Sequence, residues 1–268
     1  MQTSIPTPRI SVVEIGPFTI HFYALCIITG VAVAIWLSNK RFVAAFPDAR
    51  GVVGDIAIVA VPAGVIGGRL YHVKTTPEKF FGADGNLIDV VKIWQGGLGI
   101  WGAITLGGVG AFTAYLVLAK RLTLPQFRYF ADAVAPGIVF AQAIGRWGNW
   151  FNAELFGRPT SLPWGLEIPR WARPIGYSEF TTFHPTFLYE SIWCAGVGFL
   201  LIRYGKRLAP GATFALYVAT YCLGRLGFEI LRIDEAHHIL GVRINVLVSV
   251  AVGVAALAAF RSFSRSSR

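Results

Sequence analysis

Long apolar runs separated by short polar segments restrict the fold of this chain more than any other feature of its sequence. A helix needs about 20 mainly apolar residues to cross the hydrocarbon core of a bilayer. Seven segments have that length and character: 18–38, 54–71, 98–119, 129–150, 186–204, 212–231 and 242–260. Only 14% of the residues are charged, whereas a soluble domain carries about 25%. The sequence therefore predicts an all-α polytopic membrane protein, with residues 1–268 forming one integral-membrane domain.

Basic residues gather directly after the first, third, fifth and seventh runs, where Asp48 is the only clear acid. These residues are Lys40, Arg41, Arg50, Lys120, Arg121, Arg128, Arg203, Lys206, Arg207, Arg261, Arg265 and Arg268. Short loops rich in Lys and Arg face the cytoplasm. We therefore expect the N-terminus outside, the C-terminus inside, and residues 151–185 as a small extracytoplasmic head. Because the basic residues lie in such loops, the net charge of +10 does not predict nucleic-acid binding.

Three other arginines, Arg69, Arg146 and Arg225, lie deeper inside apolar runs instead. A charge at the bilayer centre costs at least about 2.5–3.5 kcal/mol, so these positions need an explanation. One interpretation is that each side chain extends from the outer end of its helix to the headgroup layer. The other is that the three arginines serve an anion.

The run 212–231 carries a polar stripe that bears on this choice. Four residues at i, i+4, i+8 and i+11 share one helix face: Tyr221, Arg225, Glu229 and Arg232. Glu229 is expected to pair with an arginine of the stripe. The intramembrane arginines still outnumber the nearby acids Glu190 and Glu229, unless Glu154 and Asp132 also turn inward. Guanidinium groups bind phosphate well, so the excess predicts a phospholipid headgroup as ligand.

Two further features have simpler interpretations beside the functional ones. Glycines crowd the second and third runs, around 67–68 and 96–102, and we expect close helix packing there rather than a direct ligand role. His184 precedes the fifth run, where it is either a cap or interfacial residue or part of the site.

The segment GRWGNWFNAELFGR, residues 145–158, resembles the signature of the prolipoprotein diacylglyceryl transferase family. These bacterial membrane enzymes begin lipoprotein maturation. GGRL from residue 67, IWQGGLG from 93, HPTFLYE from 184 and GRLGFEILRID from 224 follow in the family's order. The resemblance covers nearly the whole chain, from Tyr23 to about Asp234.

The resemblance implies a reaction and its partners. A diacylglyceryl group passes from phosphatidylglycerol to the lipobox cysteine thiol of a preprolipoprotein signal peptide, which forms a thioether and releases glycerol 1-phosphate. The resemblance implies no metal or soluble cofactor. It places the enzyme in the bacterial inner membrane, with its site toward the extracytoplasmic side.

The resemblance also assigns roles to residues. Arg146 and Arg225 would stabilise the departing phosphate, while Asn149 and Gly157 would shape the headgroup pocket. Glu154 would position the glycerol hydroxyls or orient an arginine. The remaining predicted substrate-binding residues match family positions or lie nearby: Tyr23, Arg69, His184, Glu190, Tyr221 and Glu229.

One position departs from the family pattern, because Trp101 stands where members commonly have histidine. Tryptophan cannot accept a proton. His184, Glu154 and Glu190, in that order, are candidates for the base that activates the thiol. Alternatively, a cationic pocket raises the thiolate fraction without a dedicated base, since a free thiol has a pKa near 8.5.

Two other classes of protein also use intramembrane arginines. A transporter or flippase for an anionic lipid is one, but paired repeats typical of transporters are not evident. A structural or assembly protein is the other, and it predicts that Arg146→Ala lowers abundance rather than turnover.

Overall fold

The computed structural model describes residues 4–16, 18–82, 85–234, 238–239 and 241–265, so that Arg268 lies outside the described part. It divides into two compact units. The larger unit comprises Met1–Ser38 and Ala131–Arg268, and the smaller unit comprises Asn39–Phe130. Helices α1 (Phe22–Ala45) and α5 (Phe127–Phe151) each contribute residues to both units. That the chain acts as one domain stays a prediction.

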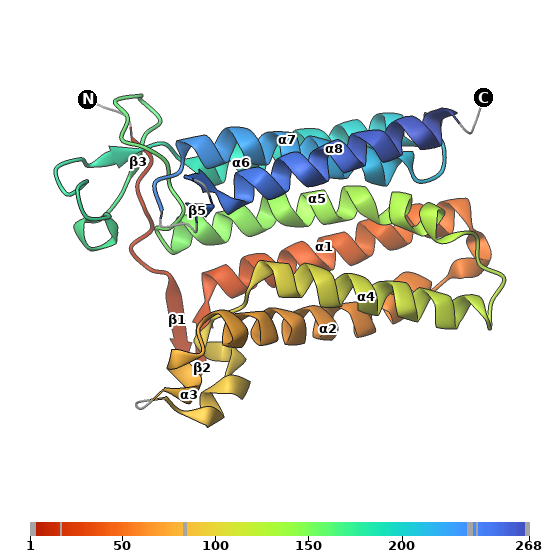
Figure 1. Cartoon of the computed structure of the whole chain (residues 1–268), viewed down its shortest axis with the longest axis horizontal. Coiled ribbons are helices and arrows are strands. Elements are labelled where there is room, and N and C mark those ends of the chain that lie inside the picture. The colour runs from red at the N-terminus through yellow and green to blue at the C-terminus, as the bar shows by residue number, and fades with distance from the viewer. Residues whose placement is uncertain (1–3, 17, 83–84, 235–237, 240, 266–268) are drawn as a thin grey trace. The chain divides into compact units, whose positions relative to one another are not determined.

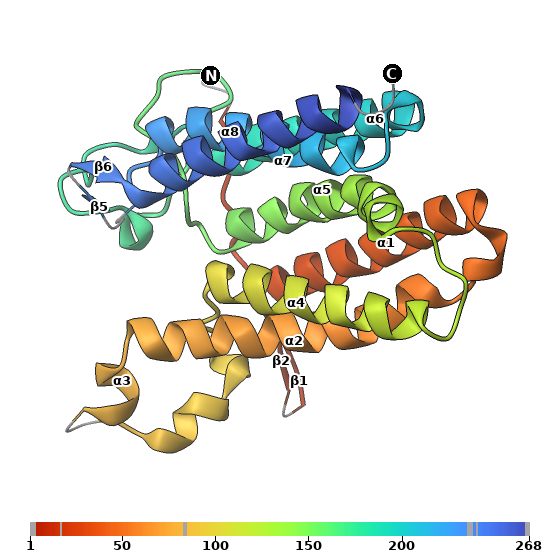
Figure 2. The ribbon, with the colours of Figure 1, turned by 45° about the vertical axis from the view of Figure 1, so that its right-hand side comes forward.

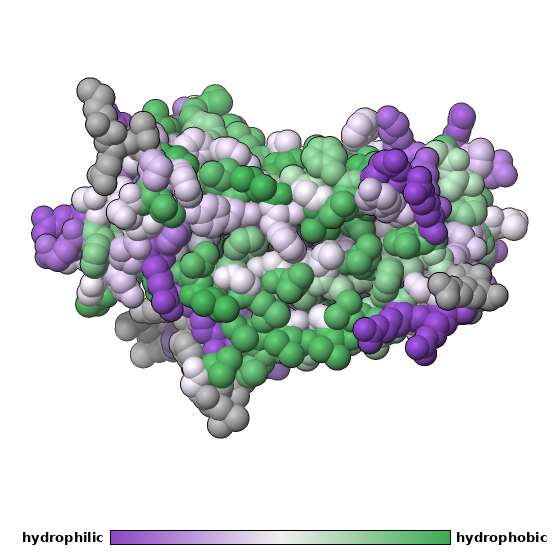
Figure 3. Space-filling view, turned by 90° about the horizontal axis from the view of Figure 1, so that it is seen from above, coloured by the Kyte–Doolittle hydropathy of each residue, from purple (hydrophilic) through white to green (hydrophobic). Residues whose placement is uncertain are grey.

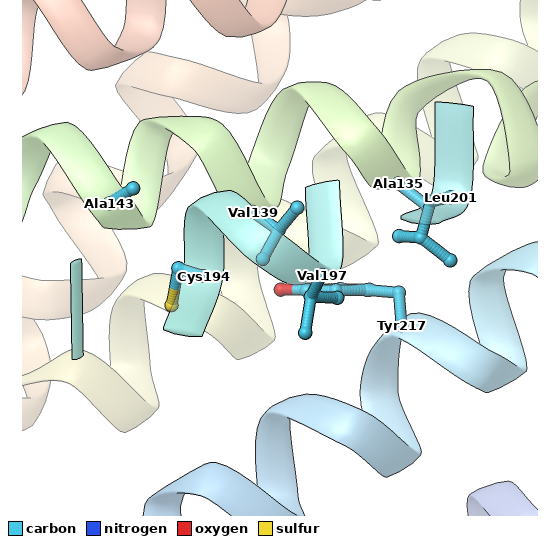
Figure 4. Packing of buried hydrophobic residues seen from close by; sticks show 7 residues of the cluster. All are labelled: Ala135, Val139, Ala143, Cys194, Val197, Leu201 and Tyr217. Atoms are coloured by element: carbon cyan, nitrogen blue, oxygen red, sulfur yellow. The ribbon is translucent and has the colours of Figure 1, made fainter. Parts of the chain in front are cut away.

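Helices α5, α6 (Thr186–Tyr204), α7 (Ala212–Leu231) and α8 (Ile244–Arg265) form most of the larger unit. Figures 1 and 2 both show α6, α7 and α8 side by side, with α5 along them. The core where α5, α6 and α7 meet is shown in Figure 4. Its buried residues are Ala135, Val139, Ala143, Cys194, Val197, Leu201 and Tyr217. Within this region, the hydroxyl of Ser191 on α6 donates to the carbonyl of Ala143 on α5 at 2.9 Å, so these two helices approach closely.

Three two-stranded antiparallel sheets are present among the described residues, which the all-α prediction omits. They pair β1 (Val12–Ile15) with β2 (Phe18–His21), β3 (Leu166–Glu167) with β4 (Thr182–Phe183), and β5 (His238–Ile239) with β6 (Val242–Arg243). Because β2 and β6 commit their backbone groups to strand partners, α1 and α8 begin at Phe22 and Ile244. The predicted runs, which begin at residues 18 and 242, therefore start too early.

The smaller unit is built on the pairing of α2 (Val52–Thr75) with α4 (Ile100–Ala119). Between them lie α3 (Glu78–Phe81), η2 (Leu87–Val91) and η3 (Ile93–Gln95), and η1 (Pro47–Ala49) precedes α2. A Cβ on Gly67 would lie 2.3 Å from the carbonyl oxygen of Gly102, and one on Gly102 would lie 2.0 Å from that of Gly67. The two backbones touch there, as the close-packing interpretation of these glycines predicts.

Six helices among the described residues are long and apolar enough to cross a membrane: α1, α2, α4, α6 with the turn that follows it, α7 and α8. On the face shown in Figure 3, hydrophobic side chains cover the middle and hydrophilic ones gather toward the ends. The polytopic prediction is therefore confirmed for six helices. Helix α5, which carries Arg128, Asp132 and Arg146, is not among them, so a seventh span stays a prediction.

The predicted head, residues 151–185, has a small apolar core together with the start of α6. Its buried residues are Phe156, Leu166, Ile168, Phe183 and Phe187. A short 3-10 helix, η4 (Arg170–Ala172), lies between β3 and β4. Gly157 pairs with Arg232, and Pro159 with Phe183, through isolated bridges. These contacts join the end of α5, the start of α6 and the end of α7 at one place in the larger unit.

Candidate functional site

A chain of alternating charges crosses the larger unit from α5 to the start of α8. Nε of Arg146 lies 2.9 Å from Oε2 of Glu190, and Nη1 of Arg225 lies 3.5 Å from the same oxygen. Nη2 of Arg225 lies 2.8 Å from Oε2 of Glu229, although that carboxylate oxygen has no aligned hydrogen-bond donor. Glu190 therefore connects two arginines that come from different helices.

The carboxylate of Glu229 is fully buried and has further partners at the β6–α8 junction. Its Oε1 accepts hydrogen bonds from Nε of Arg243 at 2.7 Å and from Nδ2 of Asn245 at 3.2 Å. Arg232 forms a bidentate pair with Asp234, at 2.7 and 2.8 Å, and Arg243 also reaches Asp234 at 3.1 Å. Burial raises the pKa of the Asp234 carboxyl, but the hydrogen bonds and charges of both arginines outweigh this and lower it below its ordinary value.

The charges of this network do not cancel. Within the described residues it holds four guanidinium groups against three carboxylates, an excess of one positive charge. Its members are Arg146, Arg225, Arg232, Arg243, Glu190, Glu229 and Asp234. The side chains of Arg146 and Arg225 remain 18% and 16% exposed, whereas Glu190 and Glu229 are 4% and 0% exposed. The accessible part of the network is therefore cationic, and it can bind an anion.

Asp132 lies at the start of α7. Its carboxylate accepts hydrogen bonds from the backbone N–H groups of Gly211, at 2.6 Å, and Phe214, at 2.8 Å. These groups lie in the first turn of α7, which has no intrahelical partners for them. Asp132 therefore caps α7, at the end of that helix far from Glu229.

The turn that follows α5 holds Glu154 in a strained backbone. Ala153 and Leu155 have φ values of 52° and 57°, which non-glycine residues rarely adopt. Oε1 of Glu154 accepts hydrogen bonds from Nδ2 of Asn149 at 2.8 Å and from Nδ2 of Asn152 at 3.3 Å. The hydroxyl of Thr186 donates to the carbonyl of Leu155. Such strain persists only where surrounding contacts enforce it, and it is frequent at functional sites.

Gly157 stands at a close crossing of three segments. A Cβ there would lie 2.8 Å from Cβ of His184 and 3.2 Å from the carbonyl oxygen of Leu231. The N–H of Gly157 donates to the carbonyl of His184 at 2.9 Å, and that of Arg158 donates to Leu231 at 2.9 Å. Gly157 thus fixes the start of α6 against the end of α7, which carry Glu190 and Glu229. Its predicted part in shaping the headgroup pocket stays a prediction.

Two tyrosines lie beside the arginines. A Cβ on Gly148 would meet the ring of Tyr23 at 2.5 Å, so this glycine lets Tyr23 of α1 pack directly on α5. Tyr23 interacts electrostatically with both Glu154 and Arg146. Tyr221, one turn before Arg225 on α7, interacts electrostatically with Arg146. The polar stripe of α7 therefore faces the signature segment.

His184 lies just before α6 and is partly buried. Its Nδ1 is 3.2 Å from the hydroxyl of Tyr189, which accepts a hydrogen bond from Nε1 of Trp164 at 3.0 Å. Burial lowers the pKa of the imidazole, which favours the neutral form that can accept a proton.

Arg69 and Trp101 belong to the smaller unit. The guanidinium of Arg69 is buried and donates to the carbonyl groups of Asp89, Val90, Gly96 and Gly97. It lies 5.2 Å from the ring centroid of Phe80. These contacts organise the segment between α3 and α4, and the role of Arg69 in substrate binding stays a prediction. Trp101 lies in the first turn of α4.

Three residues of the site, Asp234 and Arg243 of the network and Asn245 beside it, are missed by reasoning from the sequence. The available signal was Arg243 itself, a cation inside the predicted run 242–260. Helical spacing cannot connect it to Glu229, because β6 and a hairpin intervene.

Among the described residues, no group of three or more His, Cys, Asp or Glu side chains is placed to hold a metal ion.

Comparisons with known proteins identify relatives of this chain. The family model described as prolipoprotein diacylglyceryl transferase matches residues 11–261. A relative from Streptomyces coelicolor, named phosphatidylglycerol–prolipoprotein diacylglyceryl transferase 2, is 55% identical over 95% of this chain and 79% of its own length. Two further relatives are named phosphatidylglycerol–prolipoprotein diacylglyceryl transferase. The one from Streptomyces griseus is 52% identical over 94% of this chain and 75% of its own length. The one from Bifidobacterium adolescentis is 48% identical over 96% of this chain and 79% of its own length.

The bacterial relatives and the apolar helices together indicate where such a chain resides. It is a multi-pass bacterial membrane protein.

Proposed function

Because the chain belongs to the prolipoprotein diacylglyceryl transferase family, we propose that it transfers the diacylglyceryl group of phosphatidylglycerol to the lipobox cysteine of preprolipoproteins. This transferase reaction is the first step of bacterial lipoprotein maturation. The observation that carries the proposal is the buried network in which Glu190 joins Arg146 to Arg225, with one guanidinium in excess. Such a site suits one lipid phosphate.

The chemistry requires stabilisation of a leaving group. The cysteine sulfur attacks the glyceryl carbon that bears the phosphate ester, so that a carbon–sulfur bond forms as the carbon–oxygen bond breaks. Glycerol 1-phosphate leaves with the bonding electrons, and the thiol proton passes to a base. Negative charge grows on the departing oxygen, where fixed cationic donors in a water-poor site lower the barrier. Arg146 and Arg225 supply these donors.

The other predicted residues support this pair. Glu190 and Glu229 hold the two guanidinium groups in place through the ion pairs described above. Glu154, fixed by Asn149, orients the glycerol hydroxyls of the headgroup. Tyr23 and Tyr221 border the same space, and Gly157 keeps α6 and α7 close together.

His184 is the best of the three candidates for the base. Glu190 is already engaged by two arginines. Glu154 already accepts hydrogen bonds from two amide groups. Burial lowers the pKa of the His184 imidazole, which favours the neutral form that can accept a proton. We propose that it takes the place of the histidine that Trp101 replaces.

We further propose that α5 is a seventh span and that both units form one integral-membrane domain. The basic segments after α1, α4, α6 and α8 support a cytoplasmic C-terminus. Residues 151–185 and the network then lie toward the extracytoplasmic side of the inner membrane, where preprolipoprotein signal peptides present their cysteine. A nucleic-acid partner is not expected. The alternative of a transporter or flippase is not favoured, because the matched family consists of transferases.

The test uses purified protein in liposomes that contain phosphatidylglycerol, with a peptide that carries a lipobox cysteine. Mass spectrometry would detect a diacylglyceryl adduct on that thiol. We expect the adduct to disappear with Arg146→Ala and with a Cys→Ser peptide. Liposomes of phosphatidylcholine alone are the lipid control. A folded protein that forms no adduct would overturn the proposal, and lipid transport would then be measured.

A further inference from the structure

Arg243 is partly buried and contacts Glu229, which is the ion-pair partner of Arg225. Its three donor nitrogens are all engaged: Nε with Oε1 of Glu229 at 2.7 Å, Nη1 with the carbonyl of Arg232 at 3.1 Å, and Nη2 with Oδ2 of Asp234 at 3.1 Å. Its side chain is 15% exposed. Because these bonds run inward to protein groups, Arg243 is arranged as a support rather than as a ligand for substrate.

The two oxygens of Glu229 are divided between different partners. Oε1 faces Arg243 and Asn245, which both come from the β6–α8 junction. Oε2 faces Arg225 at 2.8 Å and Arg232 at 3.9 Å. The junction therefore fixes the rotation of the carboxylate, and the rotation fixes where Arg225 lies.

Because Arg243 and Arg225 both pair with the carboxylate of Glu229, neither arginine is fully neutralised by it. While Arg243 neutralises part of Glu229, the charge on Arg225 is less fully compensated. Without Arg243, the charge of Glu229 would be shared by Arg225 and Arg232 only. The positive excess of the network would then vanish, because three guanidinium groups would face three carboxylates. The cation available to a lipid phosphate thus depends on a residue that does not touch that phosphate.

We propose that Arg243 is a positioning residue for the transfer reaction, acting through Glu229 on Arg225. This inference rests on the proposed function. It predicts an effect on turnover rather than on peptide binding, because Arg225 acts on the departing phosphate. Displacing a group at a reacting centre by about 1 Å can cost about 100-fold in rate.

The experiment compares kcat and KM for the lipobox peptide in the same liposomes. We expect Arg243→Met to lower kcat about 10- to 100-fold with little change in KM, and Arg243→Lys to restore most of the loss. In a Glu229→Gln background, Arg243→Met should cause little additional loss, since coupled positions are not additive. Arg261→Met, at the exposed far end of the same helix, is the matched control and should keep wild-type turnover.

An unchanged kcat in Arg243→Met would overturn the inference. So would a double variant, Arg243→Met with Glu229→Gln, whose kcat falls below that of Glu229→Gln by as much as Arg243→Met alone lowers it. If Arg243→Met does not fold, Asn245→Ala decides, because Asn245 donates to the same oxygen: a lowered kcat supports the inference and an unchanged one overturns it. Wild-type protein that forms no adduct would instead overturn the proposed function itself.

Discussion

Arg146 on α5 and Glu190 on α6 form an ion pair of 2.9 Å in the larger unit. The same carboxylate oxygen faces Arg225 on α7 at 3.5 Å. One acid therefore sets the spacing of the two arginines that we assign to the lipid phosphate.

Replacing Glu190 tests this arrangement. Removing one member of a buried ion pair leaves the other charges uncompensated, which costs about 3–5 kcal/mol. We expect Glu190→Ala to lower the free energy of unfolding by that order, and Glu190→Gln to lower it less while still reducing turnover. Unfolding in detergent, followed by tryptophan fluorescence, measures the first effect. Glu179→Gln, at an exposed site in the head, should change neither.

Arg146 is expected to act on turnover through its bidentate geometry. Loss of a donor that stabilises developing charge costs about 100- to 1000-fold in kcat. Arg146→Lys keeps the charge but not the planar fork, so we expect only partial activity from it and almost none from Arg146→Ala. Adduct formation per folded protein is the readout. Equal activity of the lysine variant and the wild type would show that charge alone suffices.

The contact between α2 and α4 predicts a large effect of a single methyl group. Gly67→Ala would place its Cβ 2.3 Å from the carbonyl oxygen of Gly102, so the helices must separate, at about 1–3 kcal/mol. Gly108→Ala is the control on α4, because a Cβ there meets nothing within 4 Å. It should be neutral or stabilise the helix by up to about 1 kcal/mol. Thermal unfolding of both variants in detergent gives the comparison.

Asp132 should stabilise the start of α7. It accepts hydrogen bonds from the N–H groups of Gly211 and Phe214, and loss of a side-chain cap costs about 0.5–2 kcal/mol. Asp132→Ala is expected to lower the free energy of unfolding by this amount. Asp132→Asn, which keeps one carbonyl oxygen, should lose less. Since Asp132 lies at the start of α7, at the opposite end of that helix from Arg225 and Glu229, turnover per folded molecule should not change in either variant.

His184 predicts a pH dependence of stability with a definite sign. Its pKa is lowered in the folded protein by burial, whereas an unfolded histidine has a pKa near 6.5. The unfolded state therefore binds more protons, and the stabilising contribution is present above about pH 6.5 and is lost as pH falls through the folded pKa. We expect the free energy of unfolding to fall less in His184→Gln than in the wild type when pH is lowered from about 7.5 to 5.5. If His184 is also the base, the fall of kcat/KM at acidic pH that the wild type shows should be absent from His184→Gln.

Hydropathy and helical spacing determined much of this protein without a structure. The runs 186–204 and 212–231 coincide with α6 and α7, because about 20 apolar residues in a bilayer leave the backbone few alternatives to a helix. Spacing along α7 placed Arg225 and Glu229 on one face, and they form the expected ion pair. The signature around Arg146 indicated the family that the comparisons then showed.

Only the tertiary structure decided which charges meet. Glu190 lies between Arg146 and Arg225, Asp132 caps a helix about 80 residues further along, and Arg243 reaches back to Glu229 from the β6–α8 junction. Spacing in the sequence fixes neighbours within one helix. Partners on different helices depend on which faces pack together, and here small residues such as Gly148 and Gly157 set those approaches.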